Sequence, residues 1–231
     1  MPDIIISDVH LGSPFCNYQA FSQFLAALPD NARLILNGDT LDNPHAKLPD
    51  KGEQALRDIA DLSRRIRAVI WVEGNHDAPA PPPPLAHLET TKHITLQQKI
   101  YVTHGHCLDT VMPRHRWFIK LFHFLHNIRI ALGAPPVHVA EYAKKWPRLF
   151  NVLRRNVLSN ALASAREHGC SVVTCGHIHK CEEAETEGIR YLNTGSWTQS
   201  TFCYVLVQPD HVKLIRFTPG DSVPPKPDAT P

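Results

Sequence analysis

The chain has 231 residues, of which 43% are hydrophobic and 20% are charged, and its formal net charge is +2. These values are ordinary for a globular protein with a sizeable core, and so small a charge indicates no particular partner by itself. The sequence lacks a transmembrane stretch of about 18 apolar residues, and its first residues lack the features of a secretory signal peptide. We therefore expect a cytoplasmic protein.

Cysteine spacing points to the same compartment. No Cys-x-x-Cys pair occurs, and no secretion signal accompanies the cysteines. The pattern predicts free, reduced thiols rather than a disulfide framework, with an unassigned thiol role as the alternative. The six cysteines are Cys16, Cys107, Cys170, Cys175, Cys181 and Cys203.

Apolar runs and helical spacing predict the elements of the first part of the chain. Between the first three runs, Phe21 and Phe24, and later Leu56 and Ile59, recur at helical spacing. Strands that alternate with helices predict a largely parallel sheet covered by helices. The runs that predict buried strands are 4–6, 34–36, 69–72, 100–102 and 172–173.

Beyond Cys181 the pattern changes to hairpins. Segment 182–187 can pair with 189–192, and segment 201–207 with 211–217. These pairs predict a second, more antiparallel sheet, and hence an α/β sandwich. The proline-rich segment 218–231 is expected to be a loosely ordered tail, which leaves 1–217 as the domain.

A short polar motif follows each of the five predicted strands. Because ligands bind outside the carboxyl ends of strands in open α/β sheets, we expect the motifs to meet at one edge. Carboxylates, imidazoles and an amide suit divalent metal ions, and no cysteine takes part. The series therefore predicts a metal site. In chain order the motifs are Asp8-Val9-His10, Gly38-Asp39-Thr40-Leu41-Asp42, Gly74-Asn75-His76-Asp77, His104-Gly105-His106 and Gly176-His177-Ile178-His179.

This series resembles that of the calcineurin-like metallophosphoesterases, over roughly residues 3–207. The resemblance implies an α/β fold of two facing mixed β-sheets flanked by helices, and a site for two divalent metal ions. Manganese is expected, with iron, zinc or nickel as alternatives. The implied ligands are Asp8, His10 and His179 for one metal, Asn75, His104 and His177 for the other, and Asp39 as the bridge between them.

The resemblance also implies a reaction. Two cations about 3.5–4 Å apart would activate a bridging hydroxide for in-line attack on a phosphodiester or pyrophosphate. His76 would stabilise the developing charge or protonate the leaving oxygen, and Asp42 would hold His76 in its tautomer and orientation. Two roles are open for His106: a contact with the substrate, or a structural hydrogen bond. Asp77 is expected to be structural.

The spacing of the motifs indicates an insertion. From Asp8 to Asp39 is 31 residues, from Asp39 to Asn75 is 36, and from Asn75 to His104 is 29, whereas from His104 to His177 is 73. The shorter intervals each suit one strand–helix–strand step. The last interval leaves room for an additional segment between the fourth and fifth motifs.

The inserted segment, residues 112–168, is apolar-faced, helical and basic. It holds ten Lys or Arg and two Glu, for a net charge of +8, which leaves −6 for the rest of the chain. One interpretation is a helical hairpin packed on the core with a solvated basic face. The other is a cap over the metal site that admits an amphipathic substrate, with Arg114, Arg116 and Lys120 as candidate substrate-binding residues. A basic amphipathic cap also suits peripheral contact with the inner face of a membrane.

Within the superfamily, the arrangement looks most like the UDP-2,3-diacylglucosamine diphosphatase branch, whose members cut a pyrophosphate in a lipid A precursor and have a cap at this place. The chain departs from that branch at His76, where those enzymes have arginine, and at His106, where they have aspartate. A nuclease or general phosphodiesterase whose basic segment binds nucleic acid is the alternative. We disfavour it because the segment holds buried-type Phe and Leu rather than exposed stacking aromatics. A non-catalytic scaffold is disfavoured because every expected ligand is present.

Overall fold

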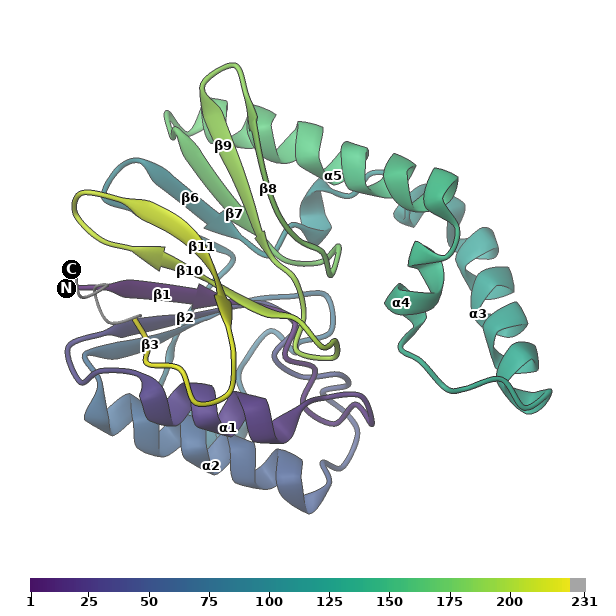
Figure 1. Ribbon diagram of the computed structural model, residues 1–231, viewed down its shortest axis with the longest axis horizontal. Coiled ribbons are helices and arrows are strands. Elements are labelled where there is room, and N and C mark those ends of the chain that lie inside the picture. The colour runs from purple at the N-terminus through teal and green to yellow at the C-terminus, as the bar shows by residue number, and fades with distance from the viewer. Residues whose placement is uncertain (225–231) are drawn as a thin grey trace, which may run out of the picture.

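Two mixed β-sheets, packed face to face, form the centre of the molecule (Figure 1). The computed structural model describes residues 1–224, except for the side chains of residues 115–119 and 123. The first sheet has the order β11-β10-β1-β2-β3-β4 and the second β5-β6-β7-β9-β8. The bounds are β1 Asp3–Ile6, β2 Arg33–Asn37, β3 Ala68–Val72, β4 Glu89–Thr91, β5 His93–Leu96, β6 Ile100–Thr103, β7 Val172–Cys175, β8 Cys181–Thr186, β9 Ile189–Thr194, β10 Phe202–Val207 and β11 Val212–Phe217.

Both sheets mix parallel and antiparallel pairs. Strands β1 to β4 pair in parallel, and so do β6 with β7 and β7 with β9. The remaining pairs, β1 with β10, β10 with β11, β5 with β6 and β8 with β9, are antiparallel. The predicted α/β fold of two facing mixed sheets flanked by helices is therefore confirmed.

The apolar runs reflect burial on both faces of the central strands. In β1, Ile5 packs between the two sheets, whereas Ile4 and Ile6 face the helices. Successive side chains of a strand point to opposite faces, so a strand covered on both sides is a continuous apolar run rather than an alternating one. This is why short runs without periodicity could be assigned to strands.

The two C-terminal hairpins do not form one sheet together, as the sequence had led us to expect. The β8–β9 hairpin pairs with β7, and the β10–β11 hairpin pairs with β1 in the other sheet. Strands β6 and β7, which precede the fourth and fifth motifs, lie in the second sheet. Hydrophobic patterns identify strands but carry little information about which partner each one finds.

Helices cover both outer faces of the sandwich. Helices α1 (Tyr18–Ala27) and α2 (Asp50–Arg65) pack on the first sheet, and the C-terminal half of α5 (Pro147–Glu167) packs on the second. The 3-10 helices are η1 (Pro83–Leu85), η2 (His106–Leu108) and η3 (Pro113–His115). No helix among the described residues is both long and apolar enough to cross a membrane.

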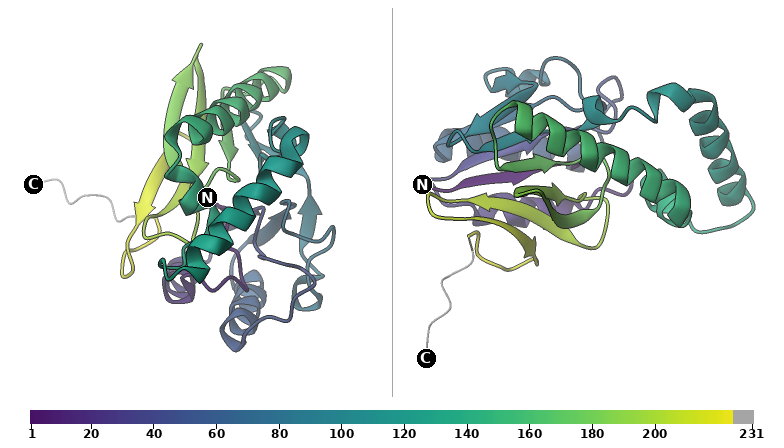
Figure 2. Two further views of the ribbon diagram at one scale, coloured as in Figure 1. Left: turned by 90° about the vertical axis from the view of Figure 1, so that its right-hand side faces the viewer. Right: turned by 90° about the horizontal axis from the view of Figure 1, so that it is seen from above.

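The predicted insertion is helical. Helices α3 (Arg116–Ala131) and α4 (Val139–Lys144), with the first half of α5, project beyond the sheets on the side where β1 and β7 end (Figures 1 and 2). We call residues 112–168 the cap. In the predicted tail, Val223 is buried in the core, and residues 225–231 lie outside the described part of the chain.

A disulfide contradicts the prediction that all six cysteines are free. Cys181, at the start of β8, is bonded to Cys203 in β10, so the bond joins the two sheets. The two residues are 22 positions apart and meet only because each hairpin joins a different sheet. Cys16, Cys170 and Cys175 are free and buried, and Cys107 is free and exposed.

Candidate metal centre

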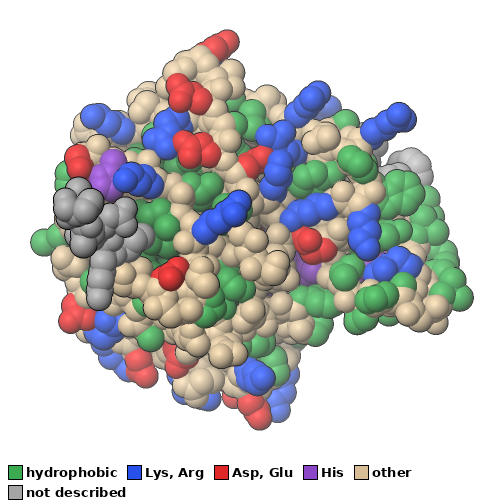
Figure 3. Space-filling model, viewed as in Figure 1, with side chains coloured by type: hydrophobic (Ala, Val, Ile, Leu, Met, Phe, Trp, Pro, Cys, Tyr) green, Lys and Arg blue, Asp and Glu red, His purple; other side chains and the backbone are tan. Residues whose placement is uncertain are grey.

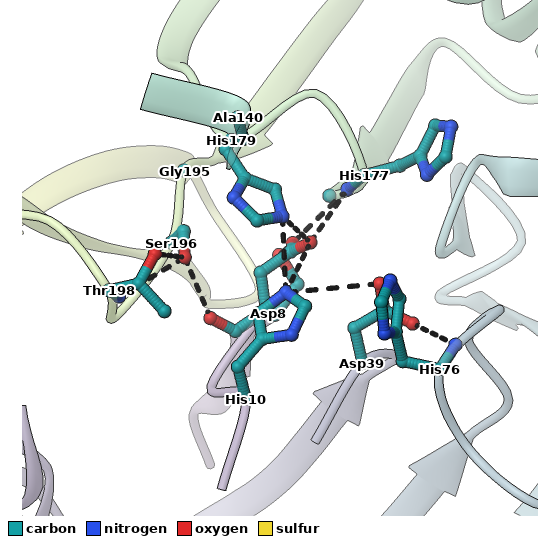
Figure 4. Close-up of polar contacts among 12 residues, drawn as sticks. Asp8, His10, Asp39, His76, Ala140, His177, His179, Gly195, Ser196 and Thr198 are labelled. Atoms are coloured by element: carbon teal, nitrogen blue, oxygen red, sulfur yellow. Dashed lines mark hydrogen bonds and ion pairs between the residues drawn. The ribbon is translucent and has the colours of Figure 1, made fainter. Parts of the chain in front are cut away.

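The five motifs meet at one end of the sandwich, where β1, β2, β3, β6 and β7 terminate (Figure 4). The backbone N–H groups of Asp8 and His10 donate to the carbonyls of Gly38 and Asp39, which fixes the first motif beside the second. Across the sheets, the His177 N–H donates to the Asp8 carboxylate. Side chains far apart in the sequence are thus held within a few ångströms of one another.

The candidate ligands occupy an unusual backbone conformation. Asp8, His10, Asp39, His177 and His179 all have positive φ angles, between 51° and 64°. The left-handed region is sparsely populated by residues other than glycine, although Asp and His enter it more readily than most. Such residues cluster where the surrounding structure holds a functional constellation.

Two glycines of the motifs are required because other atoms of the site lie where a side chain would begin. A Cβ added to Gly74 would lie 2.1 Å from the backbone nitrogen of Asp39, and one added to Gly176 would lie 2.2 Å from Oδ2 of Asp8. Real Cβ atoms do not come so near, so the glycines let the third and fifth motifs reach the carboxylates of the first two.

One cluster of four side chains has the composition of a metal site. Asp8, His10, Asp39 and His179 are buried, and each offers a ligand atom within 4.8 Å of the others. Nε2 of His179 lies 3.0 Å from Oδ1 of Asp8 and 3.1 Å from Nε2 of His10. Two imidazole nitrogens that face each other between two carboxylates suit a divalent cation. The residues therefore fit the first metal that the sequence implied.

The second ring nitrogen of His10, Nδ1, also has a hydrogen-bond partner. Its Nδ1–H donates to Oδ1 of Asp42 at 3.1 Å, which leaves Nε2 as the nitrogen that faces the cluster. Burial acts to raise the pKa of Asp42, but the hydrogen bond from His10 and the charges of the neighbouring histidines together outweigh it, and the net shift of the pKa is downward. A carboxylate on the second nitrogen is the usual support of a metal-binding histidine.

His104 and Asp39 extend the cluster towards the second implied metal. Nδ1–H of His104 donates to the Asn37 carbonyl at 2.9 Å, and its Nε2 lies 3.2 Å from Oδ2 of Asp39. Burial acts to lower the pKa of His104, but Asp39 and Asp8 raise it to about 10. A proton or a metal ion can thus satisfy this buried nitrogen, and the two would compete for it.

Asn75 and His177 complete the implied set but form a looser group. Nδ1 of His177 lies 3.0 Å from Oδ1 of Asn75, and its Nε2 lies 3.2 Å from Oδ2 of Asp109. In Figure 4 the His177 ring points away from Asp8 and His10. Among the described residues, neither His104 nor His177 belongs to a group of three or more potential ligands within 4.8 Å. The first group is therefore more compact than the second.

His76 lies at the cavity side of the cluster, and its ring is anchored on Asp42. Its Nδ1–H donates to the backbone carbonyl of Asp42 at 2.8 Å, while the Asp42 side chain contacts His10. Asp42 thus orients both histidines, His76 through the main chain and His10 through the carboxylate.

The other sequence candidates lie around the cluster or away from it. His106 is half-buried beside His104, and burial together with His104 and His177 lowers its pKa to about 4. Arg114 and Lys120 are exposed, and neither they nor His106 are among the described residues that line the cavity. The side chain of Arg116 lies outside the described part of the structure. Asp77 accepts from the N–H groups of Leu41 and Gly74, a structural arrangement.

Three residues near the cluster carried no recognisable signal in the sequence. Asp109 contacts His177 and accepts from two backbone N–H groups just beyond it. His138, at the N-terminus of α4, stacks on His179 with ring centroids 5.1 Å apart and lies 5.2 Å from His10. Lys144 donates to the backbone carbonyl of His179 at 2.6 Å. Two of them come from the cap, so only the folded chain brings them to the site.

A cavity of about 510 Å³ lies between the cluster and the cap. Its polar end holds candidate ligands and catalytic residues, and its remaining walls are mostly apolar. The polar lining residues are His10, Asp39, Asn75, His76, Asp109, His138, His177 and His179. The apolar ones are Val111, Met112, Phe122, Val139, Ala140, Ala143, Leu149, Phe150, Val152, Leu153 and Ile178.

The sandwich and its cluster of histidines and carboxylates define a metallophosphoesterase-type protein. Residues 1–210 match the model of the calcineurin-like phosphoesterase superfamily domain, and the chain belongs to this family. A comparison with curated proteins gives no match. Family and donor set together indicate a hydrolase that uses divalent metal ions.

Solved structures with a similar fold include three that we describe here. A single mutant of Vps29 from Entamoeba histolytica is 16% identical, with a TM-score of 0.48, and the match covers 94% of this chain and 100% of that one. The phosphoesterase YfcE from E. coli is 16% identical, with a TM-score of 0.47 and coverage of 92% and 91%. An archaeal phosphodiesterase is 13% identical, with a TM-score of 0.47 and coverage of 94% and 100%. At such identities the likeness concerns the fold alone.

Proposed function

We propose that the protein is a two-metal phosphoesterase that hydrolyses a phosphodiester or pyrophosphate bond in an amphipathic, nucleotide- or lipid-linked substrate. One observation carries this proposal: a single cavity has the His–Asp cluster at one end and apolar cap residues along its other walls. A substrate that fills it needs an anionic group and an apolar group close together.

The residues of the chain take distinct parts in this proposal. Asp8, His10 and His179 would hold one metal, and Asn75, His104 and His177 the other, with Asp39 between them. When bound, two divalent ions supply an activated water and charge stabilisation at the phosphorus. His76, which lines the cavity, stabilises charge on the phosphoryl group or gives its proton to the leaving oxygen.

The apolar walls support an acyl or alkyl group in the substrate. Burial of one methylene contributes about 0.8 kcal/mol, so four methylenes in the cavity contribute roughly 3 kcal/mol, or about a hundredfold in affinity. This favours the UDP-2,3-diacylglucosamine diphosphatase-like substrate class over phosphoesters without a lipid part. It also disfavours nucleic acid, because apolar cap residues line the cavity in place of cations for a phosphate backbone.

The experiment compares three substrates and repeats each assay with a variant of His76. With Mn²⁺ present, we expect hydrolysis of bis-p-nitrophenyl phosphate, and a higher kcat/KM for UDP-2,3-diacylglucosamine than for the same nucleotide sugar without acyl chains. His76→Ala should abolish turnover of all three while it retains metal, as measured by calorimetry. If single-stranded DNA is the best substrate, the nuclease alternative is correct. If metal-loaded protein turns over no ester, the proposed function is wrong.

A further inference from the structure

Exposed apolar side chains concentrate on the cap. Of the eight large hydrophobic side chains that are exposed among the described residues, only Met1 lies outside it. Single exposed hydrophobic residues are normal, but a contiguous group on one element marks an interaction surface. The seven cap residues are Leu121, Phe124, Leu125, Ile128, Leu132, Trp146 and Val152.

Five of the seven share one face of α3 or continue it. Leu121, Phe124, Leu125, Ile128 and Leu132 follow one another at intervals of three, one, three and four, which places them on a single stripe. Their exposed fractions run from 39% for Ile128 to 83% for Leu132. A stripe of this kind is buried in an ordinary surface helix.

The opposite side of α3 already has its partner. Phe122 packs on Tyr142 of α4, with ring centroids 5.0 Å apart, and His126 lies 4.7 Å from the same ring. The exposed stripe is therefore a second apolar face rather than the core-facing one. Figure 2 shows α3 as the outermost helix, at the end farthest from the sheets.

Exposed basic side chains lie on the same cap. Lys120, Lys145, Arg148 and Arg155 are exposed, and no ion pair or hydrogen bond engages their side chains in the described part of the chain. Helix α3 contains no acidic residue. Figure 3 shows the same combination, with green apolar and blue basic side chains side by side over the cap. Near an anionic lipid surface each such cation contributes about a fivefold increase in binding.

One exposed apolar residue of the cap also lines the cavity. Val152 of α5 is 55% exposed and belongs to the cavity wall, to which α3 contributes Phe122. The outer surface of the cap and the apolar cavity wall therefore meet at Val152. A lipid-linked substrate that leaves a bilayer needs such a meeting point, whereas a protein partner does not.

We propose that the α3 face docks on the surface of an anionic lipid bilayer, with Phe124 and Leu132 among the acyl chains and the basic residues at the headgroups. Amphipathic helices with basic flanks lie in the plane of the membrane interface in this way. Delivery of a lipid-linked substrate into the cavity rests on the proposed function, but the docking itself does not.

Vesicle sedimentation with the full chain tests the docking. We expect the protein to sediment with vesicles of phosphatidylcholine and phosphatidylglycerol, and much less with phosphatidylcholine alone. Phe124→Asp/Leu132→Asp should lower binding to the anionic vesicles at least about tenfold. The control Gln23→Asp/Ala26→Asp places the same charges at exposed positions of α1 and should bind as the unmodified protein does.

Turnover of bis-p-nitrophenyl phosphate separates this inference from the proposed function. Neither Phe124 nor Leu132 lines the cavity, so the double variant should keep its turnover of that small ester. The docking is overturned if the unmodified protein stays in the supernatant with anionic vesicles. It is also overturned if the α3 variant only abolishes a concentration-dependent dimer in analytical ultracentrifugation, since the occupant of the face is then a second copy. Vesicle binding without any ester hydrolysis would leave the docking standing and remove the proposed function.

Discussion

At the scale of single residues, the site depends on how three of its histidines present one nitrogen and anchor the other. His10 is anchored by the Asp42 carboxylate, His104 by the Asn37 carbonyl and His76 by the Asp42 carbonyl. In each case an acceptor at Nδ1 leaves Nε2 for the site. The tautomer of each ring therefore follows from the chain that surrounds it.

Asp42→Asn should weaken metal binding without displacing His76. The amide oxygen can still accept from His10, but the negative charge that supports the imidazole is lost. We expect a reduction of about 10–100-fold in the affinity of the stronger site, measured by calorimetry with Mn²⁺. Asp61→Asn, which removes an exposed carboxylate on α2, serves as the control and should leave affinity unchanged. Equal affinities in all three proteins would contradict the assigned role of Asp42.

Gly74→Ala should destabilise the fold and disrupt the cluster together. The new methyl group would lie 2.1 Å from the Asp39 backbone, so the second and third motifs must separate. We expect a loss of several kcal/mol in the free energy of unfolding, seen as a lower Tm, and a loss of metal binding. Gly188→Ala is the matched control, since no atom lies within 4 Å of its added Cβ and the substitution costs only about 1 kcal/mol of backbone strain. Equal Tm values for the two variants would refute the close approach.

Most of the residues in the cluster could be found from the sequence, because each belongs to a motif directly after a strand. Within each sheet the motifs meet because their strands run in parallel, and the packing of the two sheets brings the two groups together. Asp109, His138 and Lys144 could not be found this way, because they are isolated residues whose neighbours carry no pattern. That His76 contacts the main-chain carbonyl of Asp42, while the carboxylate contacts His10, also could not be found from the sequence, because both groups belong to the same residue.

At the scale of elements, α4 is the part of the cap that is fastened to the site. Lys144 donates to the His179 carbonyl at 2.6 Å and to Oε1 of Gln199 at 2.9 Å, and Gln199 donates to the same carbonyl at 2.7 Å. The cap is thus fixed to the loop that carries the fifth motif. This contact also positions the apolar residues of the cap that line the cavity.

Lys144→Met should loosen the cap over the cavity. Hydrogen bonds from a charged group contribute about 1.5–3 kcal/mol, so we expect at least a tenfold rise in KM for an acylated substrate. The kcat for bis-p-nitrophenyl phosphate should change little, because that ester does not need the apolar walls. Lys145→Met removes the neighbouring exposed charge and should affect neither value in the absence of membranes. A rise in KM for both lysine variants would point to charge rather than to cap position.

The elements themselves were largely predictable, whereas their partners were not. All five apolar runs lie in strands, and the basic segment is helical. The hairpins, by contrast, were expected in one sheet and divide between two. Short strands buried on both faces carry similar residues in either sheet, so hydrophobicity alone does not select the neighbour.

At the scale of the whole molecule, the Cys181–Cys203 bond ties the two sheets together close to the fifth motif. Cross-links of this loop length stabilise by roughly 3 kcal/mol, which corresponds to about 6–12 °C in Tm for a chain of this size. We expect Cys203→Ser, or reductant added to the unmodified protein, to lower the Tm by that amount in differential scanning calorimetry. Cys107→Ser removes an exposed free thiol and should not change it. A Tm that is insensitive to reductant would mean that the bond contributes nothing to stability.

The left-handed backbone of the ligand loops also has a consequence for how the protein could change over time. Each non-glycine residue held at such a φ angle costs on the order of 1–3 kcal/mol, and five of the candidate ligands carry that cost at once. Glycine at any of these positions would remove this cost. A substitution that deletes a ligand would therefore also make the fold more stable. We therefore expect the motifs to persist only while selection maintains metal binding. In a descendant that no longer needs the metals, the ligand residues should be the first to be replaced.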